Sequence, residues 1–223
     1  MKERPILFSV PMVNAILAGR KTQTRRVVKL PKSGDFDGVR VADGALLWSR
    51  PDQPTGTNVI KSPYGAPGDR LWVRETWRPA RTILPVGWSI GYAANEDRKR
   101  VAPADVPDDW QEPLAAKTGF VPSIHMPRWA SRITLEVTDV RVERLWEISV
   151  DDAKAEGVEL VRGRDVPAAM GGGVETWRDY LDPEGWVTSA QSSFSSLWRS
   201  INGAESWAAN PWVWVVNLKR VAP

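Results

Sequence analysis

The last strand-forming segment of the chain most strongly limits how this protein folds. Residues 210–219 read Asn-Pro-Trp-Val-Trp-Val-Val-Asn-Leu-Lys, and the apolar side chains of this run fall on both faces of an extended chain. A strand that is apolar on both faces must be covered on both sides, so we expect it to be central in a sheet. The fold must therefore be built around a sheet.

Other segments have the alternation or β-rich composition of strands, and long polar stretches separate them. The predicted strands cover residues 24–28, 70–77, 88–93 and 131–145, with one short hairpin around 39–47. The clearest pattern is 131–145, in which Ile133, Leu135 and Val137 alternate before a break or bulge near Asp139. The strands thus account for much of the expected core.

Helix signals are few and short. The sequence predicts helices over residues 11–18, 149–157, 174–181 and 193–201. Ser149 begins a capping-box pattern, and Gly157 is suited to the residue that ends the same helix. Strands that alternate with irregular insertions, together with few helices, predict an α+β fold built on a small β-barrel with elaborated loops.

A chain of 223 residues that is 42% hydrophobic can bury a generous core. We expect one domain over residues 1–223, with insertions at about 31–64, 78–122 and 160–192. The net charge of +3 arises from 30 basic and 27 acidic residues, so it permits nucleic-acid binding without demonstrating it. Only local clusters of charge are informative.

Composition also excludes several classes of chemistry. The absence of cysteine excludes disulfides and thiolate catalysis and argues against a structural zinc site. The single histidine, His125, cannot form a two-histidine metal site. The charged N-terminus is not followed by the apolar segment of a signal peptide, and no run of about 18 apolar residues occurs. We therefore expect a cytoplasmic protein with no membrane association, no metal and no cofactor.

The most informative motif for function is a basic segment that follows the first predicted helix. Residues 19–26 read Gly-Arg-Lys-Thr-Gln-Thr-Arg-Arg, which combines four cations with two hydroxyls and no acid. Such a cluster suits an anionic or polar ligand. Gly19 is suited to the positive φ of the residue after a helix, so the basic residues enter a strand together. The alternative is a solvated basic turn at the start of that strand.

A second candidate is the carboxylate of Glu75. Alternation in residues 70–77 places Glu75 on the same face as Leu71, Val73 and Trp77. A carboxylate on an apolar face is either paired with a base such as Arg25 or held for a chemical role.

The order of these motifs resembles the ASCH-domain family. The motifs that carry the resemblance are the segment Gly19-Arg-Lys-Thr-Gln-Thr24 after a helix, Gly68-Asp69 before a strand, the helix end Ala155-Glu-Gly157 and the closing Trp-Val-Trp-Val-Val strand. The N-terminal motif and the run Ile124-His-Met-Pro-Arg-Trp-Ala-Ser-Arg132 are similar to the longer members of bacteriophages and prophages. The resemblance covers about half of the chain and implies a PUA-like β-barrel.

This resemblance implies two kinds of function. The family is associated with the recognition of RNA or modified nucleotides, and its small bacterial members are amidohydrolases that remove the acetyl group of N(4)-acetylcytidine. In those enzymes a lysine and a threonine of the Gly-x-Lys-Thr-x-Thr motif act with a later glutamate. The corresponding residues here are Lys21, Thr24 and Glu156.

These three residue types form a workable amide hydrolase. Lys21, with a pKa lowered by burial and by nearby arginines, is expected to take the proton of a Thr24 nucleophile. Glu156 would hold the lysine or pass a proton to the leaving amine, and Arg25 or backbone N–H groups would stabilise the oxyanion. Because residues 21 and 24 of a regular strand face opposite sides, Lys21 must precede the strand or a bulge must intervene.

Two classes of function stay open. As an enzyme, the protein hydrolyses an acylated cytidine; as a binding module, it holds RNA or a modified nucleotide, with Arg132 and tryptophans such as Trp72, Trp77 or Trp129 contributing. The alternative for the catalytic trio is a surface ion pair and a strand threonine. The residues expected to bind the substrate or nucleic acid are Arg20, Arg25, Arg26, Glu75, His125 and Arg128. For His125 the alternative is a packed or solvent-facing loop residue.

Overall fold

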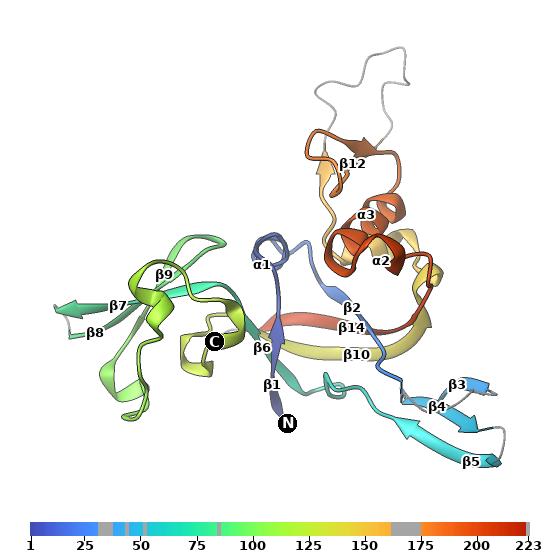
Figure 1. Cartoon of the computed structure of the whole chain (residues 1–223), viewed down its shortest axis with the longest axis horizontal. Helices are drawn as coiled ribbons and strands as arrows, with labels where there is room; N and C mark the ends of the chain where they lie inside the picture. Colours follow the sequence, from blue (N-terminus) through green and yellow to red (C-terminus); the bar gives the residue numbers. More distant parts are fainter. Residues whose placement is uncertain (31–37, 43–44, 51–52, 84–85, 162–174, 222–223) are drawn as a thin grey trace. The chain divides into compact units, whose positions relative to one another are not determined.

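The structure is a computed structural model that describes residues 1–30, 38–42, 45–50, 53–83, 86–161 and 175–221. Sheets dominate this part of the chain, and three α-helices and several short 3₁₀ turns accompany them (Figure 1). The α-helices are α1 (Val10–Leu17), α2 (Val150–Ala155) and α3 (Ala190–Asn202). The predicted α+β class is therefore confirmed.

The largest sheet has five strands in the order β1-β6-β10-β14-β2. These strands are β1 (Glu3–Leu7), β6 (Arg70–Arg74), β10 (Thr134–Arg144), β14 (Trp212–Val221) and β2 (Gln23–Val27). β1 is parallel to β6, whereas β6 pairs antiparallel with β10 and β14 antiparallel with β2. β14 is central, as its apolar faces predicted. β1 and β2 end the order, so the pairings among the described strands do not close a barrel.

The chain divides into two compact units that each combine distant segments. Unit 1 contains residues 1–18, 64–137 and 219–223, and unit 2 contains residues 19–63 and 138–218. The boundary falls within β10, where the buried side changes phase: Leu135 and Val137 are buried before it, and Val140 and Val142 after it. The strand is continuous there, and the phase change matches the irregularity expected near Asp139.

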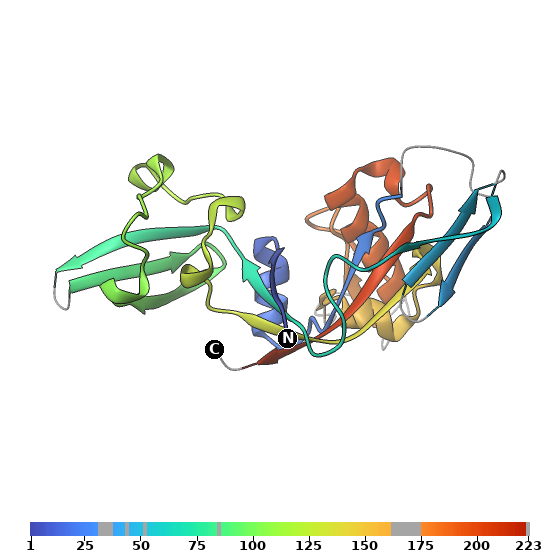
Figure 2. The ribbon, with the colours of Figure 1, turned by 90° about the horizontal axis from the view of Figure 1, so that it is seen from below.

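Unit 1 holds a three-stranded antiparallel sheet of β7 (Trp77–Ile83), β8 (Val86–Tyr92) and β9 (Asn95–Val101), visible in Figure 2. 3₁₀ turns at Leu114–Lys117, Ser123–His125 and Arg128–Ala130 belong to the same unit. The core of this part of unit 1 includes Trp77, Ile90, Tyr92, Val121 and Met126. β8 confirms the strand predicted over 88–93. The strand predicted over 70–77 is instead split into β6 and β7, because the chain leaves β6 at Glu75 to begin the second sheet.

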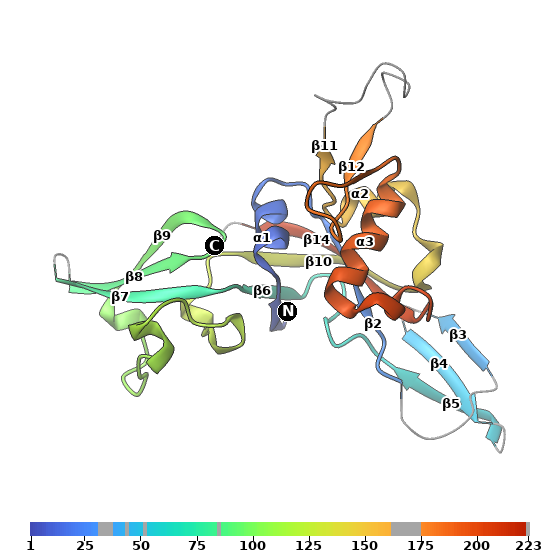
Figure 3. The same cartoon turned by 45° about the horizontal axis from the view of Figure 1, so that its top comes forward.

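Unit 2 holds α2 and α3, which lie side by side (Figure 3). Their core includes Leu145, Phe194, Trp198, Val213 and Val215.

Unit 2 also contains two small three-stranded sheets. The predicted hairpin near 39–47 is present as β3 (Gly38–Ala42) and β4 (Ala45–Arg50), and β5 (Gln53–Ile60) extends it to three strands.

The helix predicted over 174–181 is wrong. Residues Thr176–Arg178 form β12, which pairs with β11 (Leu160–Val161) and β13 (Trp186–Val187). Thr176 and Trp177 are both buried there, so pairing and burial outweigh the local helix pattern. Residues 31–37, 43–44 and 51–52 of the first predicted insertion, 84–85 of the second and 162–174 of the third lie outside the described residues.

Candidate functional site

The candidate site lies in unit 2, where the segment after Gly19 meets the end of α2. Gly19 has φ +73°, as expected for the residue that follows the helix cap. Lys21 forms an isolated antiparallel bridge with Glu156, and Thr22 N–H donates to the Ala155 carbonyl at 2.8 Å. β2 begins only at Gln23. Lys21 therefore precedes the strand, as the proposed chemistry required.

Local signals in α2 place Glu156 at this junction. The Ser149 side chain accepts a hydrogen bond from Asp152 N–H, which caps the helix start. Glu156 is the C-cap, and Gly157 follows with φ +88°. The helix is thus held at both ends, and its last turn presents the Glu156 carboxylate to Lys21.

The central contact is an ion pair between Lys21 and Glu156. Lys21 Nζ lies 2.7 Å from Glu156 Oε2 and also donates to the Glu156 backbone carbonyl at 2.9 Å. The two side chains are 0% and 3% exposed. The resemblance placed these two residues in one site, and the fold brings them into direct contact. The alternative interpretation was an ion pair of these two residues on the surface. The ion pair is present, but it is buried.

Arg25 extends this ion pair into a network. Its guanidinium is fully buried, and its Nη2 donates to Glu143 at 3.0 Å and to Asp152 at 2.9 Å, while Nη1 lies 3.6 Å from Glu156 Oε1. Arg141 adds a partly exposed cation that binds both Glu143 and Asp152. Lys21, Arg25 and Arg141 thus face the carboxylates of Glu143, Asp152 and Glu156, and Arg141 also lies 3.7 Å from Asp139.

Gln23 connects the network to β14. Its amide nitrogen donates to Asp152 and to Asn217, each at 2.8 Å, and its oxygen accepts a hydrogen bond from Arg25. The sequence interpretation did not include Asp152, Glu143, Arg141 or Gln23 in the site. The sequence signal that could have identified them is strand alternation, because residues two apart share one face of a strand. Arg141 and Glu143 are related in this way along β10, and Gln23 and Arg25 along β2.

Burial and charge shift two pKa values in this cluster. Burial lowers the pKa of Lys21 below its usual 10.5, the charge and hydrogen bond of Glu156 oppose that shift, and the charges of Arg26 and Arg25 add to it. Burial by itself raises the pKa of Asp152, but hydrogen bonds from Gln23 and Arg25 and the charges of Arg25 and Arg141 lower it to about 2. Asp152 is therefore ionised at neutral pH.

Thr24 occupies a different position. It is 1% exposed and pairs with Val216 in β14, and alternation along β2 places its side chain on the face opposite Gln23 and Arg25. Among the described residues, no hydrogen bond joins the Thr24 hydroxyl to Lys21 or Glu156. The fold thus brings Lys21 and Glu156 into contact and leaves Thr24 on the opposite face of β2 from Gln23 and Arg25.

The expected ligand-binding residues divide between the units. In unit 2, Arg20 is exposed and donates to the Gly157 carbonyl at 3.2 Å, and Arg26 is half-buried. In unit 1, Glu75 is buried and forms a bidentate pair with Arg132 rather than with Arg25. The suggested Glu75–Arg25 pairing is therefore wrong, because Arg25 is already occupied by three carboxylates.

Two further expectations concern residues 123–132. His125 is exposed in a 3₁₀ turn, which agrees with a solvent-facing loop residue, and Arg128 is paired with Glu3 at 2.9 Å. Trp77 is completely buried, so its ring has no free face on which a base could stack. It packs edge to face against Trp129, with the two ring centroids 6.0 Å apart. The carboxylates beside Arg128 and Arg132 compete with any phosphate for these guanidiniums.

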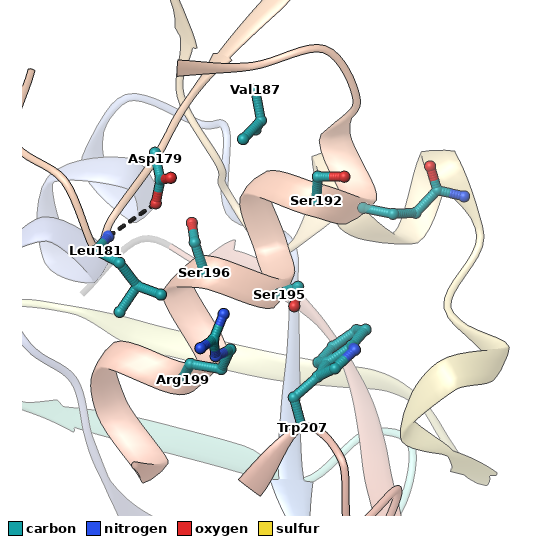
Figure 4. A pocket seen from close by; sticks show the side chains of 9 residues that line it. Asp179, Leu181, Val187, Ser192, Ser195, Ser196, Arg199 and Trp207 are labelled. Atoms are coloured by element: carbon teal, nitrogen blue, oxygen red, sulfur yellow. Dashed lines mark hydrogen bonds between the residues drawn. The ribbon is translucent and has the colours of Figure 1, made fainter. Parts of the chain in front are cut away.

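A separate pocket of about 380 Å³ lies over α3 in unit 2 (Figure 4). One stripe of the helix, Ser192, Ser195, Ser196 and Arg199, contributes to it. The remaining lining residues are Asp179, Leu181, Val187, Gln191 and Trp207. Because the lining combines a carboxylate and a guanidinium with hydroxyls, it suits an uncharged or zwitterionic polar molecule better than a polyanion. None of the residues expected from the sequence lines it.

No family model, curated protein or solved structure matches the chain. Within the described ranges, no helix combines the length and apolar composition needed to cross a membrane. The same ranges contain no group of three or more His, Asp or Glu side chains arranged to hold a metal ion.

Proposed function

We propose that this chain is an ASCH-type protein with a PUA-like core, and that the Lys21 cluster hydrolyses the amide of an acylated cytidine such as N(4)-acetylcytidine. The reaction would take place in the cytoplasm and use no metal or cofactor. The direct contact between Lys21 and Glu156 supports this proposal, because the motif resemblance selected the same two residues.

The observation that carries the proposal is a pair of unsatisfied polar atoms within the cluster. Glu156 Oε1 and Arg25 Nε are buried, and neither has a hydrogen-bond partner among the described residues. Nearly all buried polar atoms in folded proteins are hydrogen-bonded. An unsatisfied acceptor and donor beside a lysine with a lowered pKa therefore favour a site that completes its hydrogen bonds with a bound ligand.

In the proposed reaction, neutral Lys21 accepts the proton of the Thr24 hydroxyl as that oxygen attacks the acetyl carbonyl carbon. The carbonyl–nitrogen bond then breaks, and the nucleobase amine leaves with a proton from Lys21, passed directly or through Glu156. Water hydrolyses the acyl-threonine, which releases acetate and restores Thr24. The reaction requires the amine of Lys21, which is bound to Glu156 in the structure, to move to the Thr24 hydroxyl.

The test is hydrolysis of N(4)-acetylcytidine by the purified full chain, followed by chromatography of the released cytidine. Lys21→Ala and Thr24→Ala should each lose turnover, whereas Thr22→Ala should keep it, since Thr22 is an exposed threonine of the same motif. Circular dichroism would establish that each variant is folded. Absence of turnover in folded wild-type protein would refute the hydrolase proposal.

A second candidate is a non-catalytic module that binds RNA or a modified nucleotide. The observation that favours it is the burial of the whole trio, since Lys21, Thr24 and Glu156 are each less than 5% exposed. A buried ion pair also holds two segments of a fold together without taking part in a reaction. Calorimetric binding of N(4)-acetylcytidine without turnover would select this candidate over the enzyme.

A further inference from the structure

The three-stranded sheet of unit 1 has an outer face whose composition differs sharply from its inner face. Directly opposed residues of antiparallel strands project to the same side. Register therefore places Arg78, Gly91 and Arg98 in one row across β7, β8 and β9. Ala80, Ser89 and Arg100 form the next row on that side.

The inner face contributes several buried residues to the core. Trp77, Ile90 and Tyr92 project to that side and are buried. Lys99 also belongs to it, and its ammonium donates to the carbonyls of Trp129 at 2.8 Å and Ser131 at 2.7 Å. Alternation thus separates the basic run of β9 into an inner lysine that stabilises the fold and two outer arginines.

The outer face carries three exposed guanidiniums and small residues between them. Arg78, Arg98 and Arg100 are exposed, and none forms an ion pair with a carboxylate in the part of the chain that the structure describes. Arg98 Nη1 lies 3.8 Å from the position that a Cβ atom of Gly91 would occupy, so this guanidinium extends toward the middle strand. The rest of the middle strand in these rows is Ser89.

The acidic residues of this sheet lie outside the two rows. Glu96 and Asp97 are at the start of β9, beyond the register shift that follows Gly91, and Asp97 is paired with Arg132 at 2.9 Å. The basic outer face, defined as Arg78, Ala80, Ser89, Gly91, Arg98 and Arg100, therefore carries three cations, and the carboxylate of Glu96 borders it at the start of β9.

We propose that this basic outer face binds the sugar–phosphate backbone of a double-stranded nucleic acid. Arg78 and Arg98 are two strand spacings apart, about 10 Å, and Arg98 and Arg100 are about 7 Å apart along β9. Guanidiniums bind phosphates through paired hydrogen bonds, and the small middle residues let a wide polyanion approach all three. This surface is in unit 1 and is independent of the Lys21 cluster.

The composition of the face favours a duplex over a single strand. Proteins that hold single strands provide aromatic rings on which successive bases stack, and the basic outer face has no aromatic residue. Contacts to phosphate alone position a duplex without selecting its sequence. Binding should therefore be independent of base sequence and depend steeply on salt.

The experiment is fluorescence anisotropy of labelled duplexes of about 20 base pairs with the full chain, using DNA and RNA duplexes of one sequence and the matching single strands. Three phosphate contacts predict a slope of about −2.7 in log K against log salt, or about 40-fold weaker binding between about 50 and 200 mM. The DNA and RNA arms identify which duplex is preferred. Preference for single strands, or no duplex binding at the lower salt, would overturn the proposal.

Variants test whether this face is responsible. Arg78→Gln, Arg98→Gln and Arg100→Gln should each reduce the salt slope by about 0.9, and the triple variant should remove duplex binding. The matched control is the triple variant Arg144→Gln, Lys154→Gln and Arg178→Gln, which removes the same charge from exposed positions of unit 2. Equal duplex affinity of the two folded triple variants would also overturn the proposal.

Discussion

The Nζ atom of Lys21 lies 2.7 Å from Oε2 of Glu156, although 135 positions of sequence separate the two residues. Breaking one side of a buried ion pair leaves the other charge without compensation, which typically costs about 3–5 kcal/mol. Lys21→Met and Glu156→Gln should therefore each lower the free energy of unfolding by about this amount. The double variant should lose less than the sum of the single losses. Urea unfolding measures all three, and strictly additive losses would contradict a direct coupling.

The titration of Lys21 should be sensitive to Arg26. Burial lowers the pKa of Lys21 and the Arg26 charge adds to that shift, so Arg26→Gln should raise the Lys21 pKa and Arg26→Lys should leave it close to the wild-type value. NMR of the lysine side chain against pH measures this directly. Because the pKa of Lys21 is lower in the folded chain than in the unfolded chain, stability rises with pH between the two pKa values, where the unfolded chain binds the extra proton. Equal pKa values in both variants would exclude the Arg26 contribution.

Asp152 should make the protein sensitive to acid. Its pKa is about 2 in the fold against an ordinary 3.8, so the unfolded state binds more protons between these values. The stabilisation is complete above about pH 4 and is lost as the pH falls toward 2, and it amounts to about 1–2 kcal/mol after solvent screening. Unfolding measured in acid should show a smaller pH slope in Asp152→Asn than in wild type. An unchanged slope would assign the acid sensitivity to other carboxylates.

Two ion pairs in unit 1 should differ greatly in their contributions. Arg132 and Glu75 are 11% and 1% exposed, whereas Arg128 and Glu3 are 45% and 35% exposed. Glu75→Ala should cost about 3–5 kcal/mol of stability, because it leaves the largely buried Arg132 guanidinium with Asp97 as its one remaining carboxylate partner among the described residues. Arg128→Ala should cost at most about 1 kcal/mol. Chemical unfolding compares the two, and similar losses would mean that burial does not determine these contributions.

The cap of α2 should support the site at a distance from its chemistry. Ser149→Ala removes the hydrogen bond to Asp152 N–H and should destabilise the protein by about 1 kcal/mol, while Ser149→Asp should retain the cap. Thermal unfolding provides the measurement. If Ser149→Ala and Ser149→Asp are equally stable, the side-chain cap does not contribute to α2.

Several parts of the fold were predictable from short-range patterns. The apolar faces of residues 210–219 predicted a central strand, and the structure has β14 between β10 and β2. The pattern at Ser149 and Gly157 predicted both ends of α2, and Gly19 predicted the turn that places Lys21 before β2. These features depend on side-chain alternation and on backbone angles that few residues adopt, so they are written locally in the sequence.

The sequence by itself thus determined the α+β class, the central strand and the presence of a basic segment after Gly19. Only the tertiary structure decided the partners: Arg25 binds Asp152 and Glu143 rather than Glu75, and residues Thr176–Arg178 form a strand rather than a helix. The separation of Lys99 from Arg98 and Arg100 likewise depends on which side of β9 faces the core. The physical reason is that pairing and burial couple residues more than 100 positions apart, and no local pattern records which distant charge or strand will be the neighbour.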